Sequence, residues 1–96
     1  MTRDHALALL RSKEADARTA GVRAMYVFGS TARGEADASS DVDLFVDDDE
    51  RLDLFALADL RRRLSDLLGR PVDLGTRNGL RPDVRPQIER EAVRVF

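Results

Sequence analysis

Two aspartates separated by one position, Asp41 and Asp43, are the residues in this chain best suited to chemistry. Side chains two positions apart on a β-strand leave the same face, so we expect the carboxylates roughly 6–7 Å apart. Aspartate is depleted in strands, and like charges on one face repel. A divalent cation would offset that repulsion, and Mg²⁺ prefers carboxylate and phosphate oxygens. The alternative is a solvated acidic edge strand that runs on into residues 47–50.

A second feature is the segment Gly29-Ser30, which follows a run of β-branched and aromatic residues. Gly29 ends the expected strand, and Ser30 is a residue type that caps helices. A helix start exposes backbone N–H groups toward an anion, and a triphosphate is the obvious one. Arg33 is close enough in sequence to assist by charge-assisted hydrogen bonds. Taken alone, the same residues fit an ordinary turn.

Asp73 supplies a third carboxylate on a further expected strand, between Val72 and Leu74. An anion-binding turn followed by a strand with paired aspartates places complementary groups at neighbouring strand ends. The combination predicts a metal–triphosphate site, whereas each part alone would not.

The elements that must position these residues follow from hydrophobic periodicity and from turn residues. We expect a helix over 4–20, strands over 22–28 and 41–47, and a loop or short helical turn over 30–40. A helix beginning at 48–50 and ending at 68, a strand over 72–74, a loop over 77–82, a short helix ending at 91 and an edge strand over 93–96 complete the chain. The order predicts one α/β (α+β) domain over 1–96, with a small mixed sheet and helices on one face.

Composition narrows the functional classes. The net charge is −2, which disfavours general binding to DNA, and cysteine is absent, which excludes disulfides, thiolate metal sites and a cysteine nucleophile. No apolar run approaches the roughly 18 residues of a membrane helix, and no signal peptide is visible. We therefore expect a cytoplasmic protein with no membrane association.

The motif as a whole resembles a known signature. Gly29-Ser30, ten intervening residues and Asp41-Val42-Asp43 are similar to the signature of the DNA polymerase β-type nucleotidyltransferase superfamily. The fuller string over 29–34 and 40–44 resembles the minimal nucleotidyltransferase (MNT) branch. That branch includes the MntA-type antitoxins, which are commonly encoded beside a HEPN-domain toxin.

The resemblance implies a role for each site residue. Gly29 and Ser30 would hold the triphosphate of ATP, with Arg33 as a less secure phosphate contact. Asp41 and Asp43 would ligate two Mg²⁺ ions. Asp73 would ligate the catalytic ion and help to deprotonate the acceptor hydroxyl. The implied reaction is transfer of AMP to a tyrosine hydroxyl of a HEPN partner, as in type VII toxin–antitoxin pairs.

The resemblance also implies that a partner is required, because polymerases and antibiotic nucleotidyltransferases of this superfamily carry additional domains that hold the second substrate. The segment after Asp73 is too short for an acceptor-binding domain, so we expect the acceptor to be held by another chain or a second copy, in a hetero- or homo-oligomer. An alternative from a different class is a catalytically silent antitoxin that neutralises its partner by contact. Tyr26 is expected to pack within its strand. Residues 61–63 are expected to form a solvated helix face, with a partner-binding patch as the alternative. Arg77 and Arg81 are expected to be solvated loop residues, with a contact to phosphate or to the partner as the alternative.

Overall fold

The structure is a computed structural model that describes residues 1–37 and 39–96, so Ala38 of the expected 30–40 loop lies outside the described residues. Its elements in chain order are α1 (Arg3–Arg11), α2 (Glu14–Ala20), β1 (Val22–Phe28), α3 (Gly29–Ala32), β2 (Val42–Asp48), α4 (Leu54–Leu68), β3 (Val72–Thr76), the 3₁₀ turn η1 (Arg77–Gly79), α5 (Arg85–Glu91) and β4 (Val93–Arg94).

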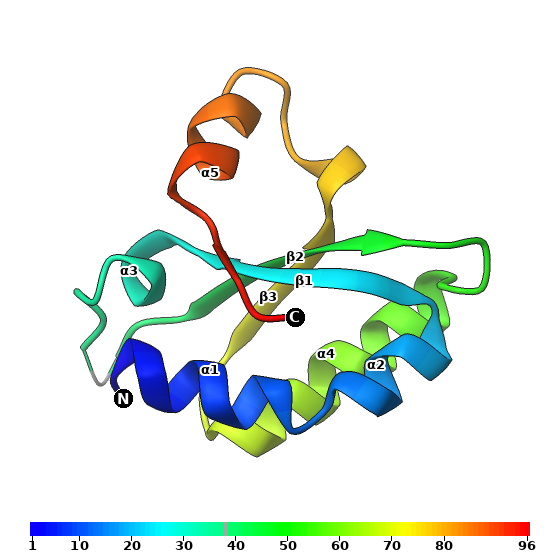
Figure 1. Ribbon diagram of the computed structural model, residues 1–96, viewed down its shortest axis with the longest axis horizontal. Coiled ribbons are helices and arrows are strands. Elements are labelled where there is room, and N and C mark those ends of the chain that lie inside the picture. Colours follow the sequence, from blue (N-terminus) through cyan, green and yellow to red (C-terminus); the bar gives the residue numbers. More distant parts are fainter. Residues whose placement is uncertain (38) are drawn as a thin grey trace.

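The four strands form one mixed sheet in the order β3-β2-β1-β4. β1 pairs antiparallel with both β2 and β4, whereas β2 and β3 run parallel. The parallel pair requires a crossover, and α4 supplies it on one face of the sheet (Figure 1). This is the α+β arrangement with a small mixed sheet that the sequence predicts.

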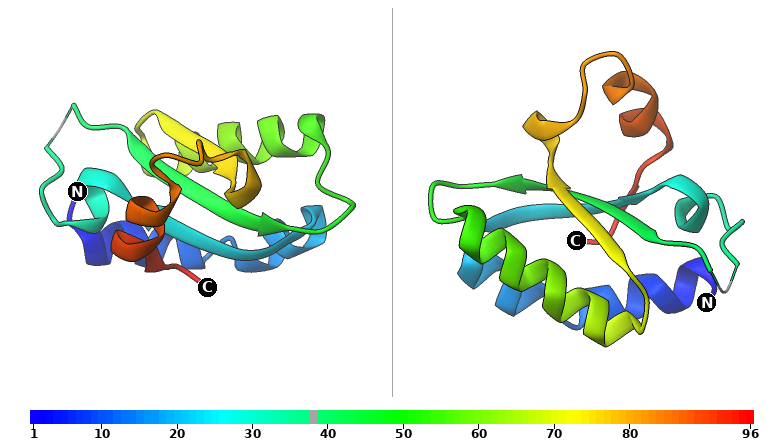
Figure 2. Two further views of the ribbon diagram at one scale, coloured as in Figure 1. Left: turned by 90° about the horizontal axis from the view of Figure 1, so that it is seen from above. Right: turned by 180° about the vertical axis from the view of Figure 1, so that it is seen from behind.

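The two faces of the sheet are different. On one face, α1, α2 and α4 cover a core to which β2 contributes Val42, Leu44 and Val46 (Figure 1). The period-two prediction for this strand is therefore confirmed. The chain from η1 to α5 is on the other face of the sheet (Figure 2). We call this second face the site face, because Asp43 is on it. The expectation that helices lie on one face holds for α1, α2 and α4 but not for α5.

The first expected helix is in fact two. The structure breaks it after Arg11, and α2 begins at Glu14. The Ser12 hydroxyl donates a hydrogen bond to the Leu9 carbonyl oxygen (2.5 Å) at the break, a local bond that competes with the helix. The alanine- and leucine-rich pattern continues through this point and so conceals the break.

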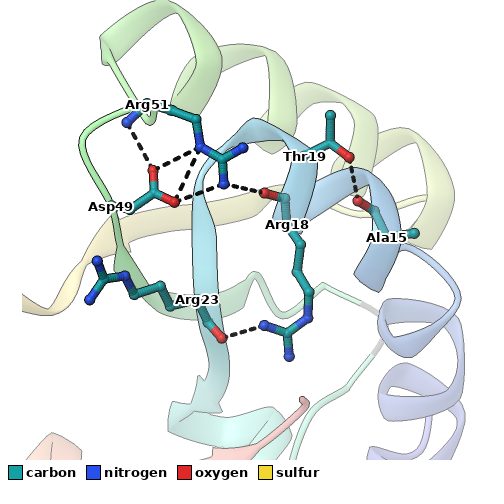
Figure 3. A network of polar contacts seen from close by, with 6 residues as sticks. All are labelled: Ala15, Arg18, Thr19, Arg23, Asp49 and Arg51. Carbon is teal, nitrogen blue, oxygen red and sulfur yellow. Dashed lines mark hydrogen bonds and ion pairs between the residues drawn. The ribbon is translucent and has the colours of Figure 1, made fainter.

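The start of α4 also differs from the prediction. Residues 48–50 end β2 and form a turn, and the helix begins at Leu54, where the Asp53 carboxylate accepts a hydrogen bond from the Ala56 N–H (2.8 Å). The acidic residues of the turn serve a different purpose. Asp49 accepts hydrogen bonds from the Arg51 side chain, and Arg51 in turn donates to the Arg18 carbonyl oxygen (Figure 3). This network ties the connection to α2.

The remaining boundaries are close to expectation. The edge strand is confirmed as β4, which pairs Val93 with Val27, and the 30–40 segment begins with the short helix α3. β3 extends two residues further than predicted, to Thr76. Within the described residues, no helix combines the length and apolar character needed to cross a membrane.

Candidate functional site

The turn after β1 and the start of β2 are in direct contact. Gly29 has a φ of 70°, a left-handed conformation that favours glycine. A Cβ atom built at Gly29 would lie 2.5 Å from Oδ2 of Asp43. Glycine is thus required twice, once by the backbone angle and once by the carboxylate. The sequence predicts that these two features form one site, and the structure brings them together.

Two of the three predicted carboxylates lie on adjacent strands, and the third directly precedes one of them. Asp43 of β2 is opposite Asp73 of β3 in the parallel register. Asp41 directly precedes β2, so the strand begins one residue later than the predicted range of 41–47. Asp43 is half-buried, whereas Asp41 and Asp73 are exposed. The site therefore has one partly desolvated carboxylate and two accessible ones.

Electrostatics single out Asp43. Burial raises the pKa of its carboxyl group, and the negative charges of Asp73 and Asp41 raise it further, while Arg33 opposes them. Among residues 1–37 and 39–96, Asp43 takes part in no ion pair. An unpaired, partly buried carboxylate next to like charges is a place where a cation would be stabilising.

The carboxylates of the site would form only part of the ligand set of a metal ion. Within the described part of the chain, no three carboxylate, imidazole or thiolate groups come together closely enough to hold an ion by themselves. Mg²⁺ commonly takes one or two carboxylates and completes its coordination with water and substrate phosphates. Asp43 with either exposed neighbour fits that pattern, so the metal-ligand roles of Asp41, Asp43 and Asp73 stay a prediction.

Arg33 follows α3 and has protein partners in this structure. Its guanidinium donates to Glu35 (3.0 Å) and to Glu91 of α5 (3.4 Å). Ser30, in the first turn of α3, is half-buried. A phosphate contact from Arg33 would have to compete with the two glutamates, whereas the backbone of the turn is held in place independently of them.

Sequence reasoning missed a structural arginine on the site face. Arg77 of η1 pairs with Asp47 (2.7 and 3.1 Å) and with Glu89 of α5. Its guanidinium also lies over the rings of Tyr26 and Phe45, 5.0 and 4.9 Å from their centroids. These contacts anchor α5 to the sheet.

Part of this arrangement was visible in the sequence. The period-two pattern puts Phe45 on the same face as Asp43, and its ring stacks on Tyr26 at 4.8 Å. The expectation that Tyr26 is a packing residue is thus confirmed. The expectation that Arg77 is a solvated loop residue is wrong, because its guanidinium is partly buried and pairs with Asp47 and Glu89. Sequence reasoning missed these partners because they are far away in sequence.

Comparison with known proteins decides the family. The family model of the nucleotidyltransferase domain matches residues 10–95 of this chain. The chain belongs to the nucleotidyltransferase family. This nucleotidyltransferase is 43% identical over 75 residues to the protein adenylyltransferase MntA of Thermococcus cleftensis, a match that covers 78% of this chain and 76% of the relative.

Solved structures agree with that assignment. A minimal nucleotidyltransferase is 40% identical, with a TM-score of 0.75 and coverage of 97% of this chain and 95% of the other. The fold also matches a complex described as a tri-AMPylated Shewanella oneidensis HEPN toxin with an MNT antitoxin (TM-score 0.73, 19% identity, 99% of this chain and 72% of the other). The resemblance predicted from Gly29-Ser30 and Asp41-Val42-Asp43 is therefore confirmed at the level of the family.

Proposed function

We propose that this nucleotidyltransferase transfers AMP from ATP to a tyrosine hydroxyl of a HEPN-domain toxin and so acts as its antitoxin. The observation that carries the proposal is the contact of the Gly29 turn with Asp43, in register with Asp73. Supporting it, one relative is a protein adenylyltransferase, and one neighbour by fold is an MNT antitoxin in complex with an AMPylated HEPN toxin.

In the proposed reaction, the turn at Gly29 and Ser30 holds the triphosphate through backbone N–H groups, which the start of α3 leaves without intrahelical partners. Asp41, Asp43 and Asp73 would hold magnesium, as two ions by the family resemblance. Mg²⁺, when bound, supplies charge neutralisation at the phosphates and increases the acidity of the acceptor hydroxyl.

Asp73 is the carboxylate proposed to take the proton of the acceptor hydroxyl, because it is exposed to an incoming group and faces Asp43 across the strand pair. The hydroxyl oxygen forms a bond to the α-phosphorus, and the bond from that phosphorus to the bridging oxygen of pyrophosphate breaks. Pyrophosphate leaves with the bonding electron pair. The chain contributes mainly orientation and charge placement, as is usual for phosphoryl-type transfer.

The test uses the purified chain, the purified product of the neighbouring gene, ATP and Mg²⁺. Mass spectrometry of the partner is expected to show added AMP units on tyrosine, and the label is expected to disappear with Asp41→Asn and Asp43→Asn. Asp48→Asn is a matched control, because it removes a carboxylate from the other end of β2. Neutralisation of the partner by the two site variants, with no label on any sample, would instead establish a contact-only antitoxin.

A further inference from the structure

A pocket opens on the site face next to Asp73. It has a volume of about 310 Å³ and is lined by β3, by the chain from η1 to α5, by Phe28 of β1 and by Leu44 of β2. Leu80 and Val84 give it an apolar wall, and Asp73 is also one of its lining residues. The volume is at the small end of ligand pockets and suits one aromatic ring better than a whole nucleotide.

The pocket exists because β3 has a glycine on the site face. Gly75 is two positions after Asp73 and therefore shares its face. A Cβ atom at Gly75 would meet no atom within 4 Å, so the backbone there borders open space. Gly75 has no left-handed φ, unlike Gly29. A larger residue would be compatible with the strand and would occupy the pocket.

The position of the pocket matches the direction of attack. The Gly29 turn follows β1, Asp43 is on β2 and Asp73 is on β3, so the groups follow one another across adjacent strands. The pocket is not lined by the described residues of the proposed phosphate site, Gly29, Ser30 and Arg33. With the triphosphate on the turn, pyrophosphate leaves on the β1 side, and in-line displacement brings the acceptor oxygen from the β3 side.

We propose that the pocket around Gly75 receives the aromatic ring of the acceptor residue and presents its hydroxyl group to Asp73. This inference rests on the proposed function, because it takes the acceptor to be a phenol. Leu80, Val84 and Phe28 provide apolar contact for the ring. Arg81 also lines the pocket, and its side chain is largely exposed and so accessible to a partner surface. The adenine of ATP is the competing occupant, and the test separates the two.

The experiment measures binding and does not depend on transfer. N-acetyl-tyrosinamide is titrated into the full chain with Mg²⁺ and α,β-methylene-ATP, and the methyl signals of Leu80 and Val84 are followed by NMR. The affinity for α,β-methylene-ATP is measured separately by calorimetry. Gly75→Val fills the pocket, Leu80→Ala removes part of its wall, and Ala58→Leu adds apolar volume at an exposed position on α4 as a control.

The expected result is a shift of both methyl signals in the unaltered chain, with affinity for the tyrosine probe weakened about tenfold or more by Gly75→Val and by Leu80→Ala. Affinity for the ATP analogue is expected to stay within about twofold in both, as in the control. A tenfold loss of analogue affinity would assign the pocket to adenine and overturn the inference, and so would an absence of methyl shifts in the unaltered chain. Failure of AMP transfer to the partner would contradict only the proposed function.

Discussion

Strand β2 carries aspartates at both ends, and the two ends differ in what surrounds them. At the C-terminal end of the strand, Asp47 pairs with Arg77, and Asp49 just beyond the strand pairs with Arg51. At its beginning, Asp43 has two carboxylates nearby and takes part in no ion pair within the described residues. The pKa of Asp49 is lowered, first by its hydrogen bond from the Arg51 side chain, whereas that of Asp43 is raised, first by burial.

We propose that the contrast separates structural from functional carboxylates on one strand. A carboxylate that stabilises the fold is paired with an arginine or lysine of the same chain. A carboxylate that takes part in chemistry has no such partner and can therefore bind a cation and a substrate. Counting acidic residues along β2 cannot make this distinction, because both ends carry aspartates. The four predictions below test it.

Asp43→Asn is expected to have the largest effect on activity. Transfer of AMP to the partner should fall by about a thousandfold, because the variant removes a charge at the reacting centre. The rate is measured by intact-mass spectrometry over time. Asp49→Asn, at the paired end, is expected to keep nearly full activity, and a comparable loss in Asp49→Asn would contradict the division between the two ends.

Arg77→Ala is expected to have the largest effect on stability. It leaves Asp47 and Glu89 without their shared cation and removes the guanidinium from Tyr26 and Phe45. We expect a loss of about 2 kcal/mol in the free energy of unfolding, measured by urea denaturation. Arg81→Ala is the control, because Arg81 is in the same segment but largely exposed. Equal losses in the two variants would show that the Arg77 contacts do not stabilise the fold.

Asp43→Asn is expected to stabilise the chain in the absence of ligands. A carboxyl group with a raised pKa in the folded state costs stability when it ionises. Below the ordinary aspartate pKa of about 3.9, variant and unaltered chain should be similar in stability. As the pH rises through the raised pKa, the unaltered chain should lose stability relative to the variant. Melting temperatures from acid to neutral pH measure this, and a variant less stable at neutral pH would contradict it.

Arg51→Ala is expected to have the smallest effect. The Arg51 side chain is 64% exposed, and surface ion pairs contribute little. Its melting temperature should fall much less than that of Arg77→Ala, and AMP transfer should be unchanged. A large loss of stability would mean that the network in Figure 3 holds α2 and the β2–α4 connection together more strongly than its exposure indicates.

Local patterns were sufficient for much of the fold and for the site motif. Period-two alternation placed Val42 and Leu44 in the core and Asp43 on the other face, and the glycine after β1 marked the turn that meets Asp43. These features depend on residues close together in sequence or on a regular strand register. The start of α4 and the break between α1 and α2 depend instead on single side-chain hydrogen bonds.

Long-range partners were not predictable in the same way. Arg77 is 30 positions from Asp47, and Arg33 is 58 positions from Glu91. Neither pair has a spacing that distinguishes it from the other arginines and acids in a chain where 35% of residues are charged. The pocket at Gly75 was missed for a related reason, since a glycine in a short strand does not reveal which segment of the chain packs next to it.

The contact between Gly29 and Asp43 has a consequence for sequence divergence. The carboxylate of Asp43 occupies the space that a side chain at position 29 would need. In a background with Asp43→Ala, Gly29→Ala is therefore expected to cost less than it does alone, which is a form of epistasis. A lineage that loses its aspartate first removes one of the two constraints on its glycine, and the left-handed backbone angle remains as the other. The two halves of the motif would then drift in a preferred order, with the turn changing after the strand.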